Sequence, residues 1–432
     1  MWGTSTSSHQ VEGNNTNNNW HAWEEEPGRV LEGHRSGLAC DWWGGRWAED
    51  MDRAATGGQN AHRLSIEWSR VQPARDRWDE SALDYYRQMI KGMVDRGITP
   101  MVTLHHFTHP LWISEIGGWE SSETPKHLYE YARRVVAALK DYVALWCTIN
   151  EPNAIAAVGY LDGAMPPGVS DIGRAFITME NLARAHVAAY QAVHEVQPSA
   201  KAGPALAYRG MHAAGPWSFV DRLVARAHSH LFNEFFPQTI RDGMMRFLTK
   251  TVPFKQARGT QDFLGVNYYT EDVVAFTFKA NEAFGHHYFP RDAEISPHGL
   301  IANRPEGFLH ALQWAAGFGV PVIVTENGVE DGADQLRPRY LAQHIQRLWR
   351  AVDAGVPVQG YFHWSLVDNF EWERGWTQRF GLWELDPQSQ LRRKRRSAEF
   401  YERICTTNSL SAETVSTYAP GVLDEVFHGS KL

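Results

Sequence analysis

Eight short runs of strand-forming residues recur along this 432-residue chain and are separated by stretches with apolar residues at helical spacing. The helical spacing is clearest at 83–94, 128–139 and 340–349. Strands and helices that alternate eight times predict an α/β fold, namely a single (β/α)8 TIM barrel with parallel strands. The expected strands are 1–7, 60–66, 99–104, 143–149, 201–206, 263–267, 320–325 and 358–364.

An open, doubly wound sheet is the alternative arrangement of the same elements. It would place a glycine-rich phosphate turn after the first strand, where this chain has Gln10-Val-Glu-Gly-Asn14. We therefore expect one barrel over residues 1–405 and a polar C-terminal tail over 406–432, either disordered or packed outside the barrel. The longest irregular stretches, 14–40 and 268–300, are predicted to be extended loops over the active-site face.

Composition excludes several classes of function. The net charge of -8 argues against binding to nucleic acid or to a membrane surface. No apolar run reaches membrane-spanning length, and the first eight residues lack the features of a secretory signal. The three cysteines, Cys40, Cys147 and Cys405, show no paired spacing and are expected to be reduced, which favours a cytoplasmic protein.

Two short segments resemble sorting or binding signals. The basic run Arg392-Arg-Lys-Arg-Arg396 precedes an amphipathic stretch and is predicted to be a solvated lead-in to the last helix. The final Ser430-Lys-Leu432 matches a peroxisomal signal, but a match of three common residues arises easily by chance.

Two glutamates follow predicted strands directly: Glu151 after 143–150 and Glu326 after 320–325. Each is followed by turn-forming residues, Pro152 in the first case and Asn327-Gly328 in the second. Parallel barrels hold their chemistry at the carboxyl ends of the strands, so both acids should face one open end. A carboxyl pair at that position suits cleavage of a glycosidic bond.

The two acids are expected to have different environments. Glu151 lies between Asn150 and an apolar segment, which favours a protonated general acid/base. Glu326 would stay ionised as the nucleophile if Arg63 and Tyr269 reach it from neighbouring strands.

Ordered motifs along nearly the whole chain resemble glycoside hydrolase family 1, the retaining β-glycosidases. The acid/base and nucleophile motifs correspond to Thr148-Ile-Asn-Glu-Pro-Asn153 and Val324-Thr-Glu-Asn-Gly328. The resemblance implies a (β/α)8 barrel with the acid on strand four and the nucleophile on strand seven, retention of configuration, no metal and no cofactor. Further matching segments are Trp2-Gly-Thr4, Ser7-Ser-His-Gln-Val-Glu-Gly13, Arg63-Leu-Ser-Ile-Glu-Trp-Ser-Arg70, Leu104-His-His-Phe107, Asp262-Phe-Leu-Gly-Val-Asn-Tyr-Tyr269 and His363-Trp-Ser-Leu-Val-Asp-Asn-Phe-Glu-Trp372.

The resemblance also implies roles for the residues around the sugar. Asn150 would bind the 2-hydroxyl, while Gln10 and Glu371 would hold hydroxyls at the far edge of the ring. Trp364 would form the floor under the sugar. His106, Phe107, Trp372 and Phe380 complete the expected sugar site, and Asn267 joins Arg63, Asn150 and Tyr269 in support of the catalytic acids.

The chain departs from the family pattern at several positions. Phe107 replaces a common tryptophan, and Ala293 replaces a tryptophan that often supports the leaving group, which predicts a wider aglycone site. His105, His106 and His109 could suggest metal ligands, but neighbouring strand residues point to opposite faces, so only one of His105 and His106 should face the open end.

These observations predict a retaining exo-β-glycosidase that hydrolyses terminal β-glucosyl residues, with β-fucosyl or β-galactosyl residues as further substrates and transglycosylation as a side reaction. Its partners would be small β-glycosides or short oligosaccharides, and its oligomeric state stays open. Glu371 disfavours phosphorylated sugars, and the presence of Glu151 indicates O-glycosides rather than thioglycosides. The alternative is a non-catalytic sugar-binding protein built on the same barrel.

Overall fold

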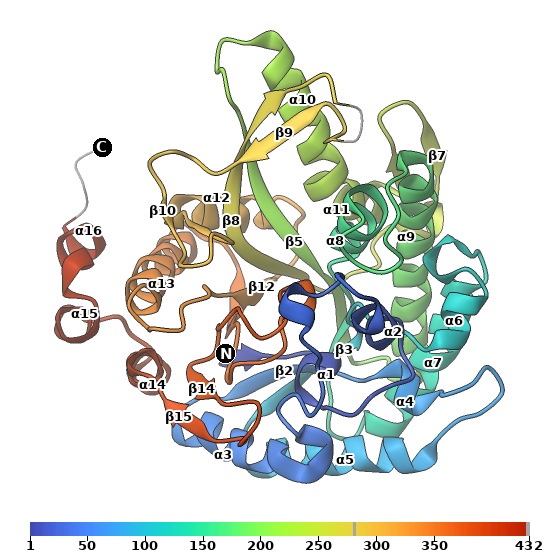
Figure 1. Ribbon diagram of the computed structural model, residues 1–432, viewed down its shortest axis with the longest axis horizontal. Coiled ribbons are helices and arrows are strands. Elements are labelled where there is room, and N and C mark those ends of the chain that lie inside the picture. The colour runs from blue at the N-terminus through green and yellow to red at the C-terminus, as the bar shows by residue number, and fades with distance from the viewer. Residues whose placement is uncertain (280–281, 429–432) are drawn as a thin grey trace.

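A computed structural model describes residues 1–279 and 282–428. Eight parallel strands form a closed barrel at its centre (Figure 1), because β12 pairs with β13 on one side and with β8 on the other. This confirms the predicted (β/α)8 barrel. The barrel strands are β1 (Trp2–Ser5), β2 (Ala61–Ser65), β3 (Thr99–His105), β4 (Leu145–Asn150), β5 (Lys201–Ala213), β8 (Leu264–Phe276), β12 (Val322–Asn327) and β13 (Val358–His363).

One long helix follows each strand and covers the outside of the barrel. Amphipathic spacing, which predicted segments of α5, α7 and α13, buries one face of these helices against the strands. The eight helices are α3 (Trp47–Thr56), α5 (Glu80–Asp95), α7 (Thr124–Leu139), α9 (Ile172–Val196), α11 (Phe235–Asp242), α12 (Pro305–Ala316), α13 (Arg337–Asp353) and α14 (Arg396–Thr407).

Shorter elements lie in the loops between strands and helices. The short helices are α1 (Ser8–Val11), α2 (Asn19–Glu25), α4 (Trp68–Val71), α6 (Leu111–Glu115), α8 (Pro152–Ala157) and α10 (Phe219–Ser229). Three small antiparallel sheets pair β6 (Met244–Arg246) with β7 (Thr251–Pro253), β10 (Glu294–Ile295) with β11 (Ala302–Asn303), and β14 (Trp383–Leu385) with β15 (Arg392–Lys394).

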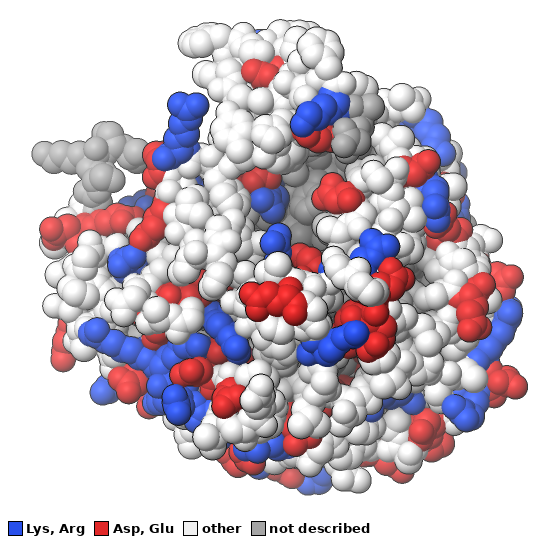
Figure 2. All heavy atoms as spheres, in the orientation of Figure 1, with Lys and Arg blue, Asp and Glu red and all other residues white. Residues whose placement is uncertain are grey.

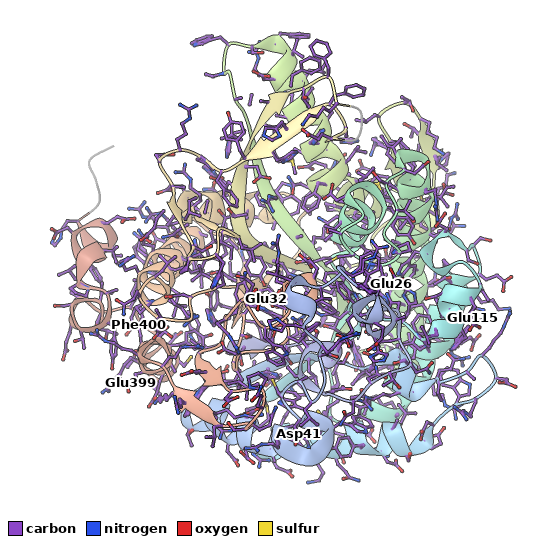
Figure 3. All side chains as sticks on the ribbon, viewed as in Figure 1. Glu26, Glu32, Asp41, Glu115, Glu399 and Phe400 are labelled. Atoms are coloured by element: carbon purple, nitrogen blue, oxygen red, sulfur yellow. The ribbon has the colours of Figure 1, made fainter. Side chains whose placement is uncertain are left out.

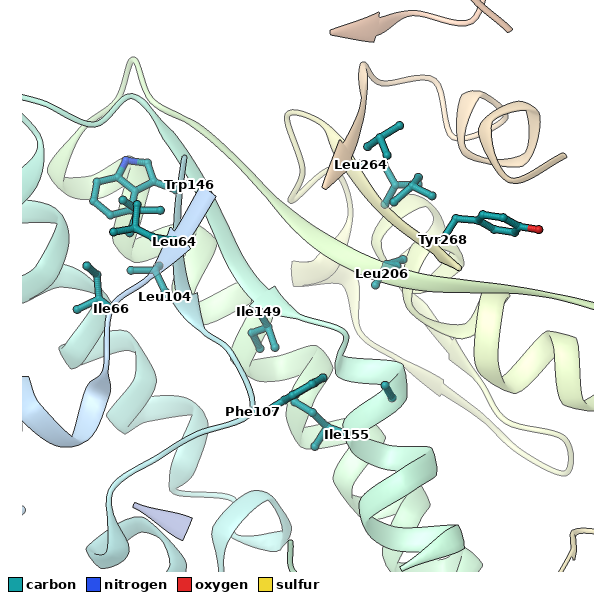
Figure 4. Packing of buried hydrophobic residues seen from close by; sticks show 14 of the residues in the cluster. Leu64, Ile66, Leu104, Phe107, Trp146, Ile149, Ile155, Leu206, Leu264 and Tyr268 are labelled. Atoms are coloured by element: carbon teal, nitrogen blue, oxygen red, sulfur yellow. The ribbon is translucent and has the colours of Figure 1, made fainter. Parts of the chain in front are cut away.

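The hydrophobic core has two layers. Between strands and helices, outward-facing residues such as Leu64, Trp146 and Leu264 pack in one large cluster (Figure 4). Inside the barrel, a smaller cluster includes Ala61 and Phe362. At Gly3 of β1 a Cβ would lie 2.3 Å from the Ala61 carbonyl oxygen, so β1 requires glycine there. This inner layer closes the barrel beneath the site.

Two barrel strands are much longer than predicted. β5 and β8 continue as a paired ribbon beyond the barrel, up to Ala213 and Val274, and β9 (Gly285–Tyr288) adds to β8 in antiparallel orientation. Together with α10 they form the lobe that projects at the top of Figure 1. The expectation that 268–300 is an irregular loop is therefore wrong where β8 continues to Phe276 and at β9 and β10, and 14–40 contains the helix α2.

Polar pairs explain why the ribbon was missed. Arg209 of β5 donates to both carboxylate oxygens of Asp272 on β8, at 2.5 and 2.7 Å. Strands are predicted from apolar residues at every second position. Charged residues such as this arginine and aspartate, paired across two strands, interrupt that pattern, so the sequence did not indicate a strand here.

The basic run at 392–396 leads into α14 as predicted, but it is solvated only at Arg393, Lys394 and Arg396. Arg392 donates to the buried Asp50 at 3.2 Å, and Arg395 binds both oxygens of the buried Asp368 at 2.8 Å. Guanidinium groups suit such paired contacts with carboxylates, so two of the five basic side chains bind buried acids in the fold.

The C-terminal segment forms helices on the outside of the barrel. After α14, where Phe400 is buried and its neighbour Glu399 is exposed (Figure 3), α15 (Ala412–Tyr418) and α16 (Leu423–Phe427) pack against α13. The boundary at residue 405 stays a prediction, and α14 runs across it. Ser430-Lys-Leu432 lies outside the described residues. Over residues 1–279 and 282–428, no helix combines the length and apolar character needed to cross a bilayer.

Candidate active site

The two strand-end glutamates line one cavity of about 210 Å³. Glu326 lies within β12, and Glu151 follows β4 directly, in a left-handed conformation with φ 45°. The space-filling view shows the surface hollowed below the projecting lobe, with acidic and basic side chains around the hollow (Figure 2). The lining residues are His106, Phe107, Asn150, Glu151, Met165, Arg209, Tyr269, Thr270, Leu300, Ile301, Glu326, Trp364, Glu371, Trp372, Glu373, Arg374 and Phe380.

Arg63 of β2 binds Glu326 at the base of the cavity. Its Nη1 donates to Glu326 Oε1 at 2.6 Å, and its Nη2 donates to Asn150 Oδ1 at 2.6 Å. The Tyr269 hydroxyl donates to the other oxygen of Glu326 at 2.7 Å. Arg63 is fully buried, so its charge acts on Glu326 at short range with little screening by solvent. Both predicted partners of Glu326 are in place.

Glu151 has a different set of contacts. Its Oε1 accepts a hydrogen bond from Asn267 Nδ2 at 2.8 Å, and no described cationic side chain forms an ion pair with it. Burial, followed by the nearby charge of Glu326, raises the pKa of Glu151 to about 8. Burial also raises the pKa of Glu326, but there Arg63 and Tyr269 act in the opposite direction. The two carboxyl groups are therefore chemically unequal.

Glu371 lies at another wall of the cavity, where Gln10 orients it. Gln10 Nε2 lies 3.2 Å from Glu371 Oε2 and is held in turn by Asn369 and the Phe370 carbonyl. Burial, followed by the neighbouring charges of Glu373 and Glu326, raises the pKa of Glu371 to about 8. Gln10 itself is buried beneath the lining residues and acts through this contact.

Aromatic residues surround the space between these acids. Trp372 packs against Trp20 at 4.6 Å between ring centroids and lies parallel to His9 at 5.8 Å. Trp364 is nearly parallel to His106 at 6.1 Å. Flat faces of this kind stack on the C–H faces of sugars.

The three histidines are divided between two environments. His106 lines the cavity and pairs with Asn150 Nδ2 at 3.1 Å, whereas His105 packs on Trp119 and His109. No cluster of three or more His, Cys, Asp or Glu side chains suited to a metal ion is found in the described part of the chain.

All predicted site residues meet at this end of the barrel. Ten line the cavity, and Arg63, Asn267 and Gln10 contact lining residues from behind. Sequence reasoning missed seven lining residues, namely Met165, Arg209, Thr270, Leu300, Ile301 and the pair Glu373 and Arg374. The last two directly follow the recognised Trp372, so continuing that motif by two residues would have found them. Ala293, expected at the aglycone site, is not among the lining residues.

Comparisons with known proteins agree with this geometry. The family model for glycosyl hydrolase family 1 matches residues 1–410. Beta-glucosidase A from Thermotoga maritima is 33% identical and aligns over 95% of this chain and 97% of its own length. A beta-galactosidase from Saccharolobus solfataricus is 30% identical over 92% of this chain and 91% of its own.

Solved structures give the same result. A beta-glycosidase from Pyrococcus horikoshii superposes with a TM-score of 0.90 and 37% identity over 96% of both chains. The Thermotoga maritima beta-glucosidase in complex with glucoimidazole gives a TM-score of 0.89 and 31% identity over 95% of this chain and 98% of the other. Fold and site thus define a barrel enzyme that hydrolyses O-glycosidic bonds. The chain belongs to glycosyl hydrolase family 1, as its motifs predicted.

Proposed function

We propose that this enzyme is a retaining exo-β-glycosidase that removes terminal, non-reducing β-D-glucosyl residues by double displacement. The inequality of the two acids supports this most directly, because Glu326 has a buried cation and a phenol as partners while Glu151 has only an amide. A nucleophile must be ionised and a general acid protonated at the same pH, which these contacts favour.

The first step forms a glycosyl-enzyme ester. Glu326 attacks the anomeric carbon while Glu151 gives its proton to the departing oxygen. In the second step Glu151, now ionised, takes a proton from water, and that water displaces Glu326 from the sugar. Two inversions restore the original configuration, and neither step needs a metal or another cofactor.

The position of Asn267 supports retention over inversion. Its amide donates to Glu151 at 2.8 Å, and its backbone lies directly opposite Glu326 in the register of β8 and β12. The two glutamates are thus joined through one residue, which supports the short carboxyl separation of roughly 5–5.5 Å that retaining enzymes use.

Glycone binding follows from the walls of the cavity. Asn150 would accept or donate at the 2-hydroxyl, His106 would bind from the side, and Glu371 would hold the far edge of the ring above Trp364. Relatives named beta-glucosidase and beta-galactosidase support β-glucosides first, with β-galactosides and β-fucosides as further substrates. At Phe107 no ring N–H is available, which would relax recognition of one sugar hydroxyl.

Outside the predicted catalytic and sugar-binding residues, the described lining residues of the cavity include no aromatic side chain, and we expect this part of the lining to face the leaving group. Met165, Leu300 and Ile301 offer apolar contacts without a flat platform, so varied aglycones should fit, and sugars or alcohols could replace water as transglycosylation acceptors. Cytoplasmic localisation remains a proposal, supported by three cysteines that are free and buried. Fractionation of the native host would test it.

Replacement of the nucleophile tests the mechanism. Glu326→Gly should lower hydrolysis of an aryl β-glucoside by at least 1000-fold, and added azide should restore turnover with a product of inverted configuration. The matched change Glu384→Gly, at an exposed acid of β14 outside the cavity lining, should keep the cavity intact. Full activity in the Glu326 variant would contradict the assignment. Absence of hydrolysis by the wild type, with sugar binding retained, would favour the non-catalytic alternative.

A further inference from the structure

Glu373 is an acid in the cavity that the mechanism above does not use. It lies in η8 (Trp372–Arg374), the turn that directly follows Glu371, and it lines the same cavity. Its side chain is 27% exposed, and the cavity is among the surfaces to which it is open.

The carboxylate of Glu373 has few partners. Within the described residues it is contacted by Arg374 Nε at 3.3 Å and by its own backbone N–H. A carboxylate can accept about four hydrogen bonds, and the exposure of Glu373 to the cavity leaves the remaining positions accessible to a ligand hydroxyl in place of solvent. Glu326 and Glu371, by contrast, are each held by donors from two residues. Glu373 is therefore an acceptor that a ligand can satisfy.

The charges around Glu373 restrict that ligand. Glu371 and Glu373 lie close enough for the charge of Glu373 to affect the pKa of Glu371. After burial, it is the second cause of the raised pKa of Glu371. A phosphate or carboxylate on the sugar would add a further negative charge beside two acids whose pKa values burial already raises, whereas a neutral hydroxyl can donate to either. The fitting chemistry is a neutral sugar hydroxyl.

The geometry of a pyranose selects which hydroxyl. Glu371 and Gln10 would occupy the ring hydroxyl opposite the anomeric carbon, while Glu373 lies two residues further along the turn, beside the more exposed Arg374. The exocyclic CH2OH group is the one hydroxyl of a hexopyranoside on a rotatable arm, so it can reach a second acceptor beyond Glu371.

We propose that Glu373 accepts a hydrogen bond from the 6-hydroxyl of the bound glycone and is a specificity-determining residue for hexosides that carry this group. The assignment rests on the proposed glycosidase function and adds a substrate preference to it: β-glucosides and β-galactosides are favoured over 6-deoxy sugars, such as β-fucosides, and over β-xylosides, which lack C6.

The test compares kcat/KM for aryl β-D-glucoside and its 6-deoxy analogue in the wild type, Glu373→Ala and Glu373→Gln. In the wild type the glucoside should be preferred by roughly 10- to 100-fold, the value of one hydrogen bond to a charged group. Glu373→Ala should reduce the preference to about threefold or less, chiefly by loss on the glucoside. Glu373→Gln, which keeps an acceptor oxygen, should fall between them.

The 6-deoxy substrate also reports whether the site is folded, because its turnover should change little in either variant. Glu384→Ala, an exposed acid on β14, is the matched control and should keep the wild-type preference. A preference unchanged in both Glu373 variants would overturn the proposal. So would equal loss on both substrates in both variants, or a glucoside 6-phosphate hydrolysed better than the glucoside.

Failure of the proposed function has a different signature. It would appear as absence of hydrolysis of every aryl β-glycoside by the wild type, or as full activity in Glu326→Gly. The preference for the 6-hydroxyl can fail while hydrolysis itself remains.

Discussion

At the scale of single residues, the site separates two chemically identical side chains by their neighbours. Glu151 and Glu326 are both buried at the ends of barrel strands. Of these two acids, only Glu326 accepts hydrogen bonds from Arg63 and Tyr269. A buried guanidinium changes the protonation of the carboxylate it contacts far more than an amide does. The division of labour is set by strands β2 and β8, which present Arg63 and Tyr269.

The proton on Glu151 should control the alkaline limb of activity. Because its pKa is raised to about 8, the acid is protonated below that pH and loses its proton above it. We expect kcat/KM for an aryl glucoside to fall tenfold per pH unit well above pH 8. In Glu151→Gln, tested with a leaving group that needs no protonation, this limb should disappear. A limb unchanged in that variant would assign it to another group, such as Glu371.

Most of the site could be predicted from sequence because its residues lie on barrel strands or directly after them. The acids, Arg63 and Tyr269 belong to short motifs whose place on a strand determines where they point. The position of Glu373 follows from the motif that contains Trp372, but its contacts depend on the turn η8, where Trp372 has φ 49°. Backbone in that region is shaped by tertiary contacts rather than by local preference.

At the scale of elements, the barrel strands were found at nearly correct positions, whereas their extensions were not. Apolar β-branched runs mark the buried parts of strands, but the outer ribbon of β5 and β8 is joined by ion pairs such as Arg209–Asp272. The basic run before α14 shows the same limit. Arg392 and Arg395 bind acids that lie far away in the chain, and no local pattern reveals such partners.

The basic run offers a matched pair of substitutions. Arg395→Met leaves the buried Asp368 without its bidentate partner and should lower the free energy of unfolding by about 3–5 kcal/mol. Arg393→Met, two residues away and exposed, should change it by less than about 0.5 kcal/mol. Denaturant unfolding of both variants measures the difference in the free energy of unfolding. Equal changes in the two variants would show that the ion pair between Arg395 and Asp368 does not stabilise the fold.

At the scale of the whole molecule, the C-terminal helices stabilise the barrel from outside without reaching the site. Val415, Ala419, Val422 and Val426 are buried where α15 and α16 meet the barrel helices, and none of them lines the cavity. The tail was expected to be polar. Its few apolar residues are widely spaced, so the sequence gave no clear signal for the helices α15 and α16.

Removal of residues 409–432 should therefore separate stability from activity. Exposure of the covered face of α13 should lower the melting temperature by several degrees, because each buried valine contributes on the order of 1–2 kcal/mol. The kcat/KM at 25 °C should stay within about twofold of the full-length value. Calorimetry measures the melting temperature and kinetics measures kcat/KM on the same sample. A large loss of kcat/KM in a truncated protein that is still fully folded would show that the tail acts on the site.

The pairing of β1 with both β2 and β13 has a consequence for synthesis of the protein. Trp2–Ser5 leaves the ribosome before the other barrel strands, yet one of its two neighbours is made only at residues 358–363. Gln10 likewise waits for Glu371, 361 positions later. Contacts so distant in sequence form late. A nascent chain that ends before β13 holds both glutamates but has an open seam and lacks Trp364 and Glu371 of the cavity, so we expect cleavage of glycosides to begin only after these residues have been made.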